Sequence, residues 1–313
     1  TYGILIQKSV QLLGPQFGID PRPIAYPSGA NRRNENDTAT EAILDGAFQG
    51  DPNKPQSIII IDTDDVYVDG LVVRNGTKDL VTSLRTGSPA DHVSRPRVRY
   101  CIVYNSTTDE GMQFKGAHDA LFEFNYVHDV AGDGLNMAVG PINAMIRFNE
   151  MNNIGSADGG IYIYDDGFSG YTDFNATIQG NVVHGCNDEG IHFGSKDGTD
   201  APFSGGKVID NIVFDARDGI RVNFSHTLIE GNEVYNCASP KYGVLGFYRP
   251  VKGIVIRNNK VHDNMASYSN GGAMGNNMGA IFIRNVAGFD LSTSFTIENN
   301  EFWNNAYQGA NPN

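Results

Sequence analysis

Residues 178–194 read Ile-Gln-Gly-Asn-Val-Val-His-Gly-Cys-Asn-Asp-Glu-Gly-Ile-His-Phe-Gly, and this stretch decides the fold. It contains two short segments in which apolar and polar side chains alternate, one around Asn181 and one after Gly190. Alternation with a period of two is typical of a β-strand that is buried on one face. The stretch therefore predicts two short strands separated by a turn.

The segment around Asn181 recurs along the chain. Each copy has an apolar residue, two variable residues, an asparagine and a second short apolar run, and the intervals between aligned asparagines are 21 to 41 residues. The aligned residues are Asn125, Asn149, Asn181, Asn211, Asn232, Asn259 and Asn300. A repeat of this length indicates a stack of similar structural units.

The segment after Gly190 is repeated as well, as an acidic or small residue followed by glycine and an apolar residue. Copies begin at Glu110, Asp133, Gly159, Glu189, Asp218 and Tyr242. Short strands joined by loops of changing length stack well as a coil of parallel strands, with rungs about 4.8 Å apart. The sequence thus predicts an all-β fold, a single-stranded parallel β-helix or solenoid, in which the aligned asparagines form a ladder of hydrogen-bonded amides.

The domain organisation is simple. No change of composition marks a boundary, so we expect one domain over residues 1–313. Proline is frequent early in the chain, at Pro15, Pro21, Pro23 and Pro27, and this predicts an irregular insertion over about residues 14–56.

The rungs, the ladder and the early stretches 4–14, 42–46 and 66–75 resemble the right-handed parallel β-helix proteins of the pectate-lyase-like superfamily. The resemblance implies a right-handed coil. It leaves the activity open, because that superfamily includes polysaccharide lyases, glycoside hydrolases, uronate epimerases, phage tailspikes and surface proteins. The Asp-Pro-His motif of mannuronan epimerases and the paired-Asp and Gly-His-Gly motifs of polygalacturonases are absent, so no catalytic residue is transferred from a family.

Composition excludes two classes of partner. The net charge is −13, which argues against a nucleic-acid surface because such surfaces need clustered basic residues. No apolar run approaches the roughly 18 residues of a membrane helix, so we expect no membrane insertion. Cys101, Cys186 and Cys237 match no zinc or redox spacing, and we expect them to be free core residues.

If the apolar residue after each glycine points inward, the next residue points outward. This predicts an outer column along one sheet, with Gln113, Asn136, Tyr162, His192, Arg221, Leu245 and Phe282. It also predicts a second column two residues further on, with Lys115, Ala138, Tyr164, Gly194, Asn223 and Phe247. We expect the two columns to cover a solvent-facing sheet.

The middle of these columns carries residue types suited to catalysis. Tyr162, Tyr164, His192 and Arg221 are the candidate catalytic residues, since His or Tyr can transfer a proton and Arg can neutralise a carboxylate, as β-elimination on uronic-acid polymers requires. Lys115, Asn136 and Asn223 are the candidate substrate-binding residues.

Acidic residues precede the glycines on several rungs, among them Glu110, Asp133, Glu189 and Asp218. Turn chemistry explains any single Asp-Gly pair, but stacked carboxylates repel, so we expect the row to bind a cation or to hold some members protonated. Calcium is the expected cation, with Asp165, Asp166, Asp188, Glu189 and Asp197 as its candidate ligands. Paired carboxyls on adjacent or alternate rungs also fit glycoside hydrolysis.

These features predict an extracellular or cell-surface β-helix that acts on or binds polysaccharide, as a lyase or a glycoside hydrolase, without an organic cofactor. The alternative is a non-catalytic structural or surface protein, because a parallel coil exposes strand edges at its two ends. In that case copies would assemble end to end into a fibre, or the chain would form part of a larger adhesin.

Overall fold

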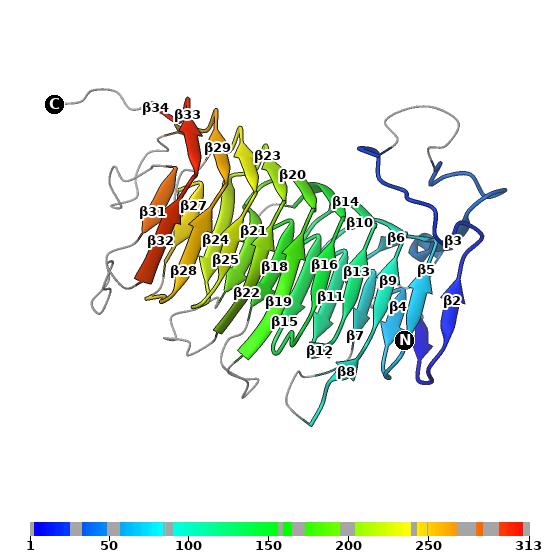
Figure 1. The fold of residues 1–313 in the computed structure, drawn as a ribbon. Coiled ribbons are helices and arrows are strands. Elements are labelled where there is room, and N and C mark those ends of the chain that lie inside the picture. Colours follow the sequence, from blue (N-terminus) through cyan, green and yellow to red (C-terminus); the bar gives the residue numbers. More distant parts are fainter. Residues whose placement is uncertain are drawn as a thin grey trace.

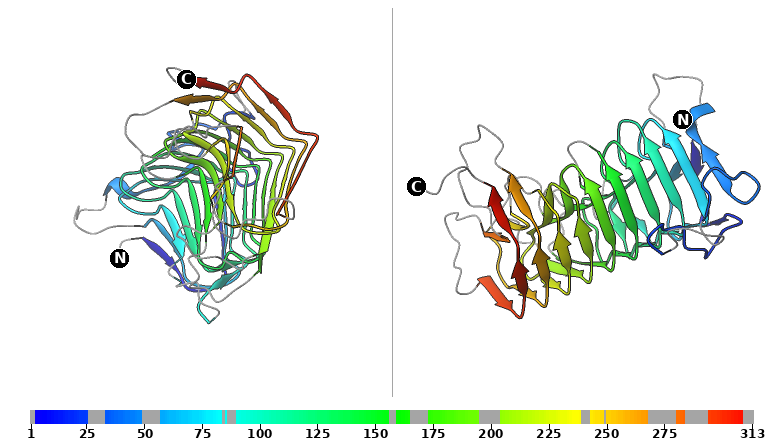
Figure 2. Two further views of the ribbon diagram at one scale, coloured as in Figure 1. Left: turned by 90° about the vertical axis from the view of Figure 1, so that its left-hand side faces the viewer. Right: turned by 90° about the horizontal axis from the view of Figure 1, so that it is seen from above.

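The computed structural model describes residues 3–25, 33–48, 57–83, 85, 90–155, 159–164, 173–194, 204–238, 243–248, 250–267, 280–283 and 294–308. Within these residues the chain winds into a coil of three long parallel sheets, and successive rungs run from one end of the molecule to the other (Figure 1). Figure 2 shows the same coil along its axis and from above. Among the described residues, no helix combines the length and the apolar character needed to cross a membrane.

Each sheet contains ten strands, and each strand pairs in parallel with its counterpart on the neighbouring rung. Sheet A consists of β1 (Ile4–Ile6), β4 (Ile59–Ile61), β7 (Val81–Ser83), β11 (Met112–Lys115), β15 (Leu135–Ala138), β18 (Ile161–Tyr164), β21 (Glu189–Gly194), β24 (Asp218–Asn223), β27 (Leu245–Phe247) and β31 (Ile281–Ile283). Sheet B consists of β2 (Gln11–Leu13), β5 (Tyr67–Asp69), β9 (Arg97–Arg99), β13 (Leu121–Glu123), β16 (Met145–Arg147), β19 (Asp173–Gln179), β22 (Ser204–Ile209), β25 (Leu228–Glu230), β28 (Ile254–Arg257) and β32 (Phe295–Glu298).

Sheet C consists of β3 (Ala42–Asp45), β6 (Leu71–Gly76), β10 (Ile102–Ser106), β14 (Tyr126–Val130), β17 (Glu150–Ile154), β20 (Val182–Cys186), β23 (Ile212–Phe214), β26 (Glu233–Tyr235), β29 (Lys260–His262) and β33 (Glu301–Trp303). Two small pairs, β8 (Val93–Ser94) with β12 (Ala117–His118) and β30 (Met265–Ser267) with β34 (Ala306–Gln308), extend individual turns. The 3-10 turn η1 (Gly46–Phe48) follows β3. The expected all-β parallel coil is confirmed.

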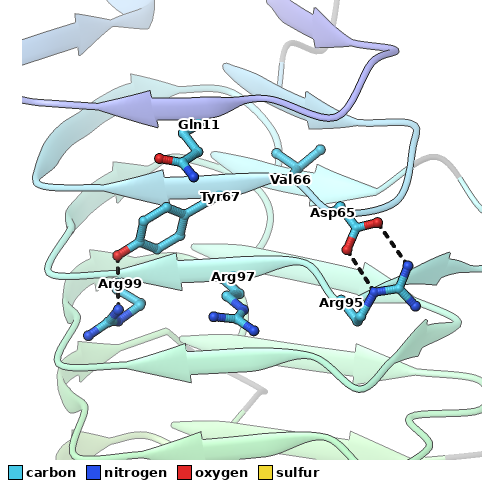
Figure 3. Close-up of a pocket in the computed structure, with 7 residues that line it drawn as sticks. All are labelled: Gln11, Asp65, Val66, Tyr67, Arg95, Arg97 and Arg99. Carbon is cyan, nitrogen blue, oxygen red and sulfur yellow. Dashed lines mark hydrogen bonds and ion pairs between the residues drawn. The ribbon is translucent and has the colours of Figure 1, made fainter.

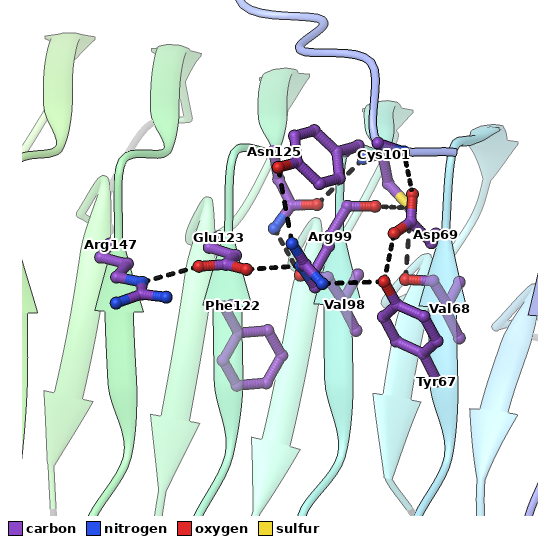
Figure 4. Close-up of polar contacts among 12 residues, drawn as sticks. Tyr67, Val68, Asp69, Val98, Arg99, Cys101, Phe122, Glu123, Asn125 and Arg147 are labelled. Carbon is purple, nitrogen blue, oxygen red and sulfur yellow. Dashed lines mark hydrogen bonds and ion pairs between the residues drawn. The ribbon is translucent and has the colours of Figure 1, made fainter. Parts of the chain in front are cut away.

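The expected asparagine ladder is also confirmed. Asn181 is fully buried, and its side-chain Nδ2 donates to the carbonyl of Ile146 at 3.0 Å and to Oδ1 of Asn211 at 2.9 Å. The same pattern joins all seven aligned residues from Asn125 to Asn300. At the N-terminal end of the ladder, Oδ1 of Asn125 accepts a hydrogen bond from the backbone N–H of Cys101 (Figure 4). The ladder thus satisfies buried backbone and amide groups at the turn between sheets B and C.

Side chains on the outside of sheet C stack as well. The rings of His184, Phe214, Tyr235, His262 and Trp303 follow one another with centroids 4.1 to 5.3 Å apart and planes within 6° of parallel. Parallel in-register pairing places equivalent residues directly above one another, so similar side chains form columns.

The apolar interior accounts for the cysteines. Cys101, Cys186 and Cys237 are all free and buried, as expected, and burial raises the pKa of the Cys101 thiol to about 12. Cys186 and Cys237 are separated by the rung of Ala216, whose carbonyl accepts from the backbone of Ala238. The thiols therefore serve as small apolar side chains of the core.

The predicted insertion at residues 14–56 needs one correction. β3 and η1 lie inside that range, and Ile43 and Leu44 of β3 pair with Val72 and Val73 of β6. Part of the range is therefore a rung of sheet C. The preceding irregular chain is fixed by a buried ion pair between Arg33 and Glu41, whose nitrogen and oxygen lie 2.6 Å apart.

Candidate functional site

The candidate catalytic column lies on the outer face of sheet A. Parallel register aligns Tyr162 with His192 and His192 with Arg221, on the neighbouring strands β18, β21 and β24. The Tyr162 and His192 rings lie 4.1 Å apart between centroids, and Tyr164 approaches the edge of Tyr162 at 5.3 Å. These four side chains therefore form one cluster on neighbouring rungs, as predicted.

The candidate binding residues are divided between two columns. Asn136 of β15 is aligned with Tyr162 and adjoins the cluster. Lys115 and Tyr164 share the second column with Ala138 between them, and Asn223 is aligned with Gly194. The structure therefore brings Asn136 to the cluster and places Lys115 and Asn223 on its borders.

Two predicted column members were wrong. Leu245 is aligned with the inward Ile220, and both Leu245 and Phe247 belong to the buried core. Gly246 takes the outward position beside Arg221 instead, and Tyr248 donates its backbone N–H to Oδ1 of Asn223. A shift of one residue along a strand moves every side chain to the other face, so the local register decides the column.

The expected solvent-facing character of this column was also wrong. His192 is 0% exposed, Asn136 4% and Tyr162 8%. The side chains are large and the rungs are close, so neighbours cover one another: Tyr162 covers His192, and the guanidinium of Arg221 lies 4.9 Å from the ring centre of Tyr248. The cluster is therefore a buried polar group on the outer side of the sheet.

A charged network holds this cluster together. Arg221 Nη1 donates to Glu189 Oε1 at 2.8 Å, and Nδ1 of His192 lies 3.9 Å from the same oxygen. Burial alone would raise the pKa of Glu189, but His192 and Arg221 outweigh it and hold the pKa below its usual value. Glu189 was predicted as a metal ligand, whereas here it is the anionic partner of His192 and Arg221.

The pKa of the Tyr162 phenol is shifted in the opposite direction. Burial, followed by the negative charge of Glu189, raises the pKa of Tyr162 well above its usual range. A phenol with a raised pKa stays neutral near pH 7, so the phenolate that could remove a proton is not populated. His192 is therefore the better candidate base of the cluster.

The predicted metal ligands are only partly brought together. Asp165, Asp166 and Asp197 lie outside the described residues. Asp188 and Glu189 have carboxylate oxygens within 4.8 Å of each other and of Asp218. Arg217 forms ion pairs with Asp188 and Asp218, and Arg221 with Glu189. Two arginines therefore already occupy these three carboxylates, and a calcium ion would have to displace them.

A second group of carboxyls lies toward the N-terminal end of the acidic row. Asp79, Asp109 and Glu110 have carboxylate oxygens within 4.8 Å of one another. Burial, and then hydrogen bonds to Asp109 and Asp79, raise the pKa of Glu110 to about 11. Like charges at this distance cannot all ionise without a cation, so one of the three carboxyls carries a proton when no cation is bound.

The comparisons with known proteins agree with this architecture. A family model described as the right handed beta helix region matches residues 152–311, which include β18 to β34 and the Tyr162–Arg221 cluster. The chain belongs to the right-handed β-helix family. No curated protein matches this β-helix chain.

Membership of the β-helix family shows the fold, and any chemical activity has to be inferred from the residues of the site. Sequence reasoning missed Glu189 as the centre of the ion-pair network, because a period of two places residues three apart on opposite faces of a strand. It also missed a hollow on sheet B. The signal there was Arg97-Val-Arg99, because a period of two places both arginines on the same face of a strand.

Proposed function

We propose that this β-helix protein is an extracellular, carbohydrate-active protein that acts on polysaccharide at the cluster of Tyr162, Glu189, His192 and Arg221. The observation that carries the proposal is a buried Glu189–Arg221 ion pair beside the buried His192 on the outer side of sheet A, next to a tyrosine with a raised pKa. Buried charges are costly, and titratable groups with shifted pKa values concentrate at functional sites.

A β-elimination on a uronic-acid polymer suits these groups. His192 would remove the proton α to the sugar carboxylate, and the electron pair would form the new C=C bond as the glycosidic C–O bond breaks. Tyr162, held neutral, would protonate the leaving oxygen, while Arg221 would stabilise the developing negative charge. Because His192 is fully buried, substrate would reach it only after a covering side chain moves aside.

Activity assays test this proposal directly. Acidic and neutral glycans would be digested while the ultraviolet absorbance of unsaturated product and the release of reducing ends are followed. We expect unsaturated product from a uronic-acid polymer, and we expect His192→Gln to lower the rate about 100-fold or more. The matched control is His184→Gln on sheet C, which should keep the parent rate.

The outcomes separate the reaction classes. Release of reducing ends without unsaturated product would show that the reaction is hydrolysis and not elimination. Equal rates for the two histidine variants would remove His192 from the reaction, and silence on every glycan would end the enzymatic proposal.

Apolar side chains exposed at the two end rungs favour a second candidate function, an end-to-end assembling structural protein. Ile4 is 41% exposed at the first rung and Ile297 is 47% exposed at the last. Both are aligned with fully buried isoleucines, Ile59 and Ile256, so they belong to the core stripe and lack a covering rung among the described residues.

A further inference from the structure

A hollow on the outer face of sheet B lies away from the cluster on sheet A. Its volume is about 310 Å³. It is formed by β2, β5 and β9 and the turns before β5 and β9 (Figure 3), and its lining residues are Gln11, Asp65, Val66, Tyr67, Arg95, Arg97 and Arg99. Three arginines in one small hollow are unusual in a protein with a net charge of −13.

Two of the arginines are fixed by carboxylates. Arg95 forms a two-pronged ion pair with Asp65, with nitrogen–oxygen distances of 2.7 and 2.8 Å. Arg99 donates to the hydroxyl of Tyr67 at 2.9 Å and pairs with Glu123 at 2.5 Å. Figure 4 shows that this chain of contacts continues to Arg147. These contacts fix the walls of the hollow and give both guanidinium groups a carboxylate partner.

Arg97 differs from its neighbours. It is exposed, and no carboxylate among the described residues forms an ion pair with it. Register places it directly beside Tyr67, which is in turn aligned with Gln11. The hollow therefore presents one available guanidinium, one amide and one phenol in a row on three neighbouring rungs.

These groups define the chemistry of a ligand. A guanidinium binds a carboxylate or sulfate through two parallel hydrogen bonds, and an amide can both donate to and accept from a sugar hydroxyl. The volume lies at the small end of ligand pockets, which suits a single sugar unit.

We propose that this hollow binds one anionic sugar unit of an acidic glycan, with Arg97 holding the anionic group and Gln11 a hydroxyl. The site is separate from the proposed reaction at His192 and does not depend on it. An acidic glycan would be held here whether the chain cleaves it or only binds it.

Calorimetric titration tests the site, with an oligouronide, a sulfated oligosaccharide and a neutral oligosaccharide of equal length as probes. We expect the oligouronide or the sulfated probe to bind, and Arg97→Gln to weaken that binding about tenfold or more, as the loss of a charge-assisted pair implies. Arg97→Lys keeps the charge and loses the paired geometry, so it should fall between the parent and Arg97→Gln.

Lys207→Gln is the matched control, because Lys207 is exposed, carries the same charge and lies further along the same outer column of sheet B. It should change the affinity less than twofold. Equal losses for Arg97→Gln and Lys207→Gln would mean general charge attraction and would overturn the site. Binding of the neutral probe as tightly as the acidic ones, or binding of none of the probes, would overturn it as well.

Binding that persists in His192→Gln but disappears in Arg97→Gln would support the hollow independently of the reaction. If His192→Gln abolished binding while Arg97→Gln kept it, the glycan site would belong to sheet A and not to the hollow.

Discussion

At the scale of single residues, polar side chains do most of the structural work where backbone groups are buried. Asn181 illustrates this: it donates to Ile146 and Asn211, and its Oδ1 accepts from the backbone and side chain of Asn149, each at 2.9 Å. One amide therefore satisfies groups on the two neighbouring rungs, and its removal leaves buried polar atoms without partners.

We expect Asn181→Ala to lower the free energy of unfolding by about 3–5 kcal/mol, because several buried hydrogen bonds are lost together. Urea denaturation at neutral pH measures the loss. Gln179→Ala on the same rung is the control, since Gln179 is only half-buried, and it should cost under about 1 kcal/mol. Equal losses of unfolding free energy for the two variants would show that the ladder asparagine stabilises the fold no more than a half-buried residue does.

A protonated Glu110 would make the stability of the fold depend on pH. Its pKa is about 11 when folded and about 4.5 when unfolded, so between these values the folded chain binds an extra proton and stability falls as pH rises. Glu110→Gln should flatten this decline and stabilise the protein by about 1 kcal/mol or more at pH 8. Thermal unfolding from pH 5 to pH 9 measures the slope.

The exposed Glu298→Gln is the control for that series and should keep the parent slope. A parent protein whose stability stays constant or rises across this pH range would contradict a protonated Glu110.

At the scale of the strands, close packing explains the glycine at the start of five strands of sheet A, β11, β15, β18, β21 and β24. Gly111, Gly134, Gly160, Gly190 and Gly219 do not have positive φ, so turn chemistry does not explain them. A Cβ at Gly190 would overlap Cγ1 of Val213 on sheet C, and one at Gly160 would overlap Cγ1 of Val183. The glycines therefore leave room for inward side chains of sheet C.

We expect Gly190→Ala to destabilise the fold by about 1–3 kcal/mol, as overpacking does. Val213→Ala removes the overlapping methyl group, so Gly190→Ala should cost clearly less in that background. A double-mutant cycle from denaturation curves gives the coupling. Additive losses would show that the two residues do not compete for the same space.

The sequence predicted the cluster up to β24 and failed at the next rung for a local reason. The regular pattern of an acidic or small residue followed by glycine aligned Tyr162, His192 and Arg221 correctly. At β27 the backbone of Val244 accepts from Ile220, so Val244 stands where a glycine was expected. Gly243, with a φ of 77°, comes one residue too early, and alignment on it exchanged the inward and outward residues.

Burial of the cluster was beyond sequence reasoning, because period two tells which face of a strand a side chain occupies and not what covers that face. The ring of Tyr162 over His192 and the pairing of Arg221 with Glu189 depend on the relative positions of three rungs. The fold was predictable because its signals, the asparagine and the alternating apolar residues, lie within a few residues of each other.

At the scale of the whole molecule, the exposed ends of the core stripe make the assembly candidate testable. If end rungs stack between copies, the mass measured by light scattering should grow with protein concentration. Ile4→Asp at one end and Ile297→Asp at the other should each reduce that growth, because a head-to-tail contact needs both surfaces. A particle mass that is constant at all concentrations would contradict assembly.

Because equivalent residues stack, the molecule can gain or lose whole turns during evolution. Residues 212–232 contain one strand of each sheet, β23, β24 and β25, and thus one complete turn in 21 residues. Duplicating or deleting such a turn would lengthen or shorten the molecule by about 4.8 Å and leave its cross-section unchanged. Length can therefore change in whole steps, and copying a turn that lies between the Arg97 hollow and the His192 cluster would lengthen the span between them without redesigning either.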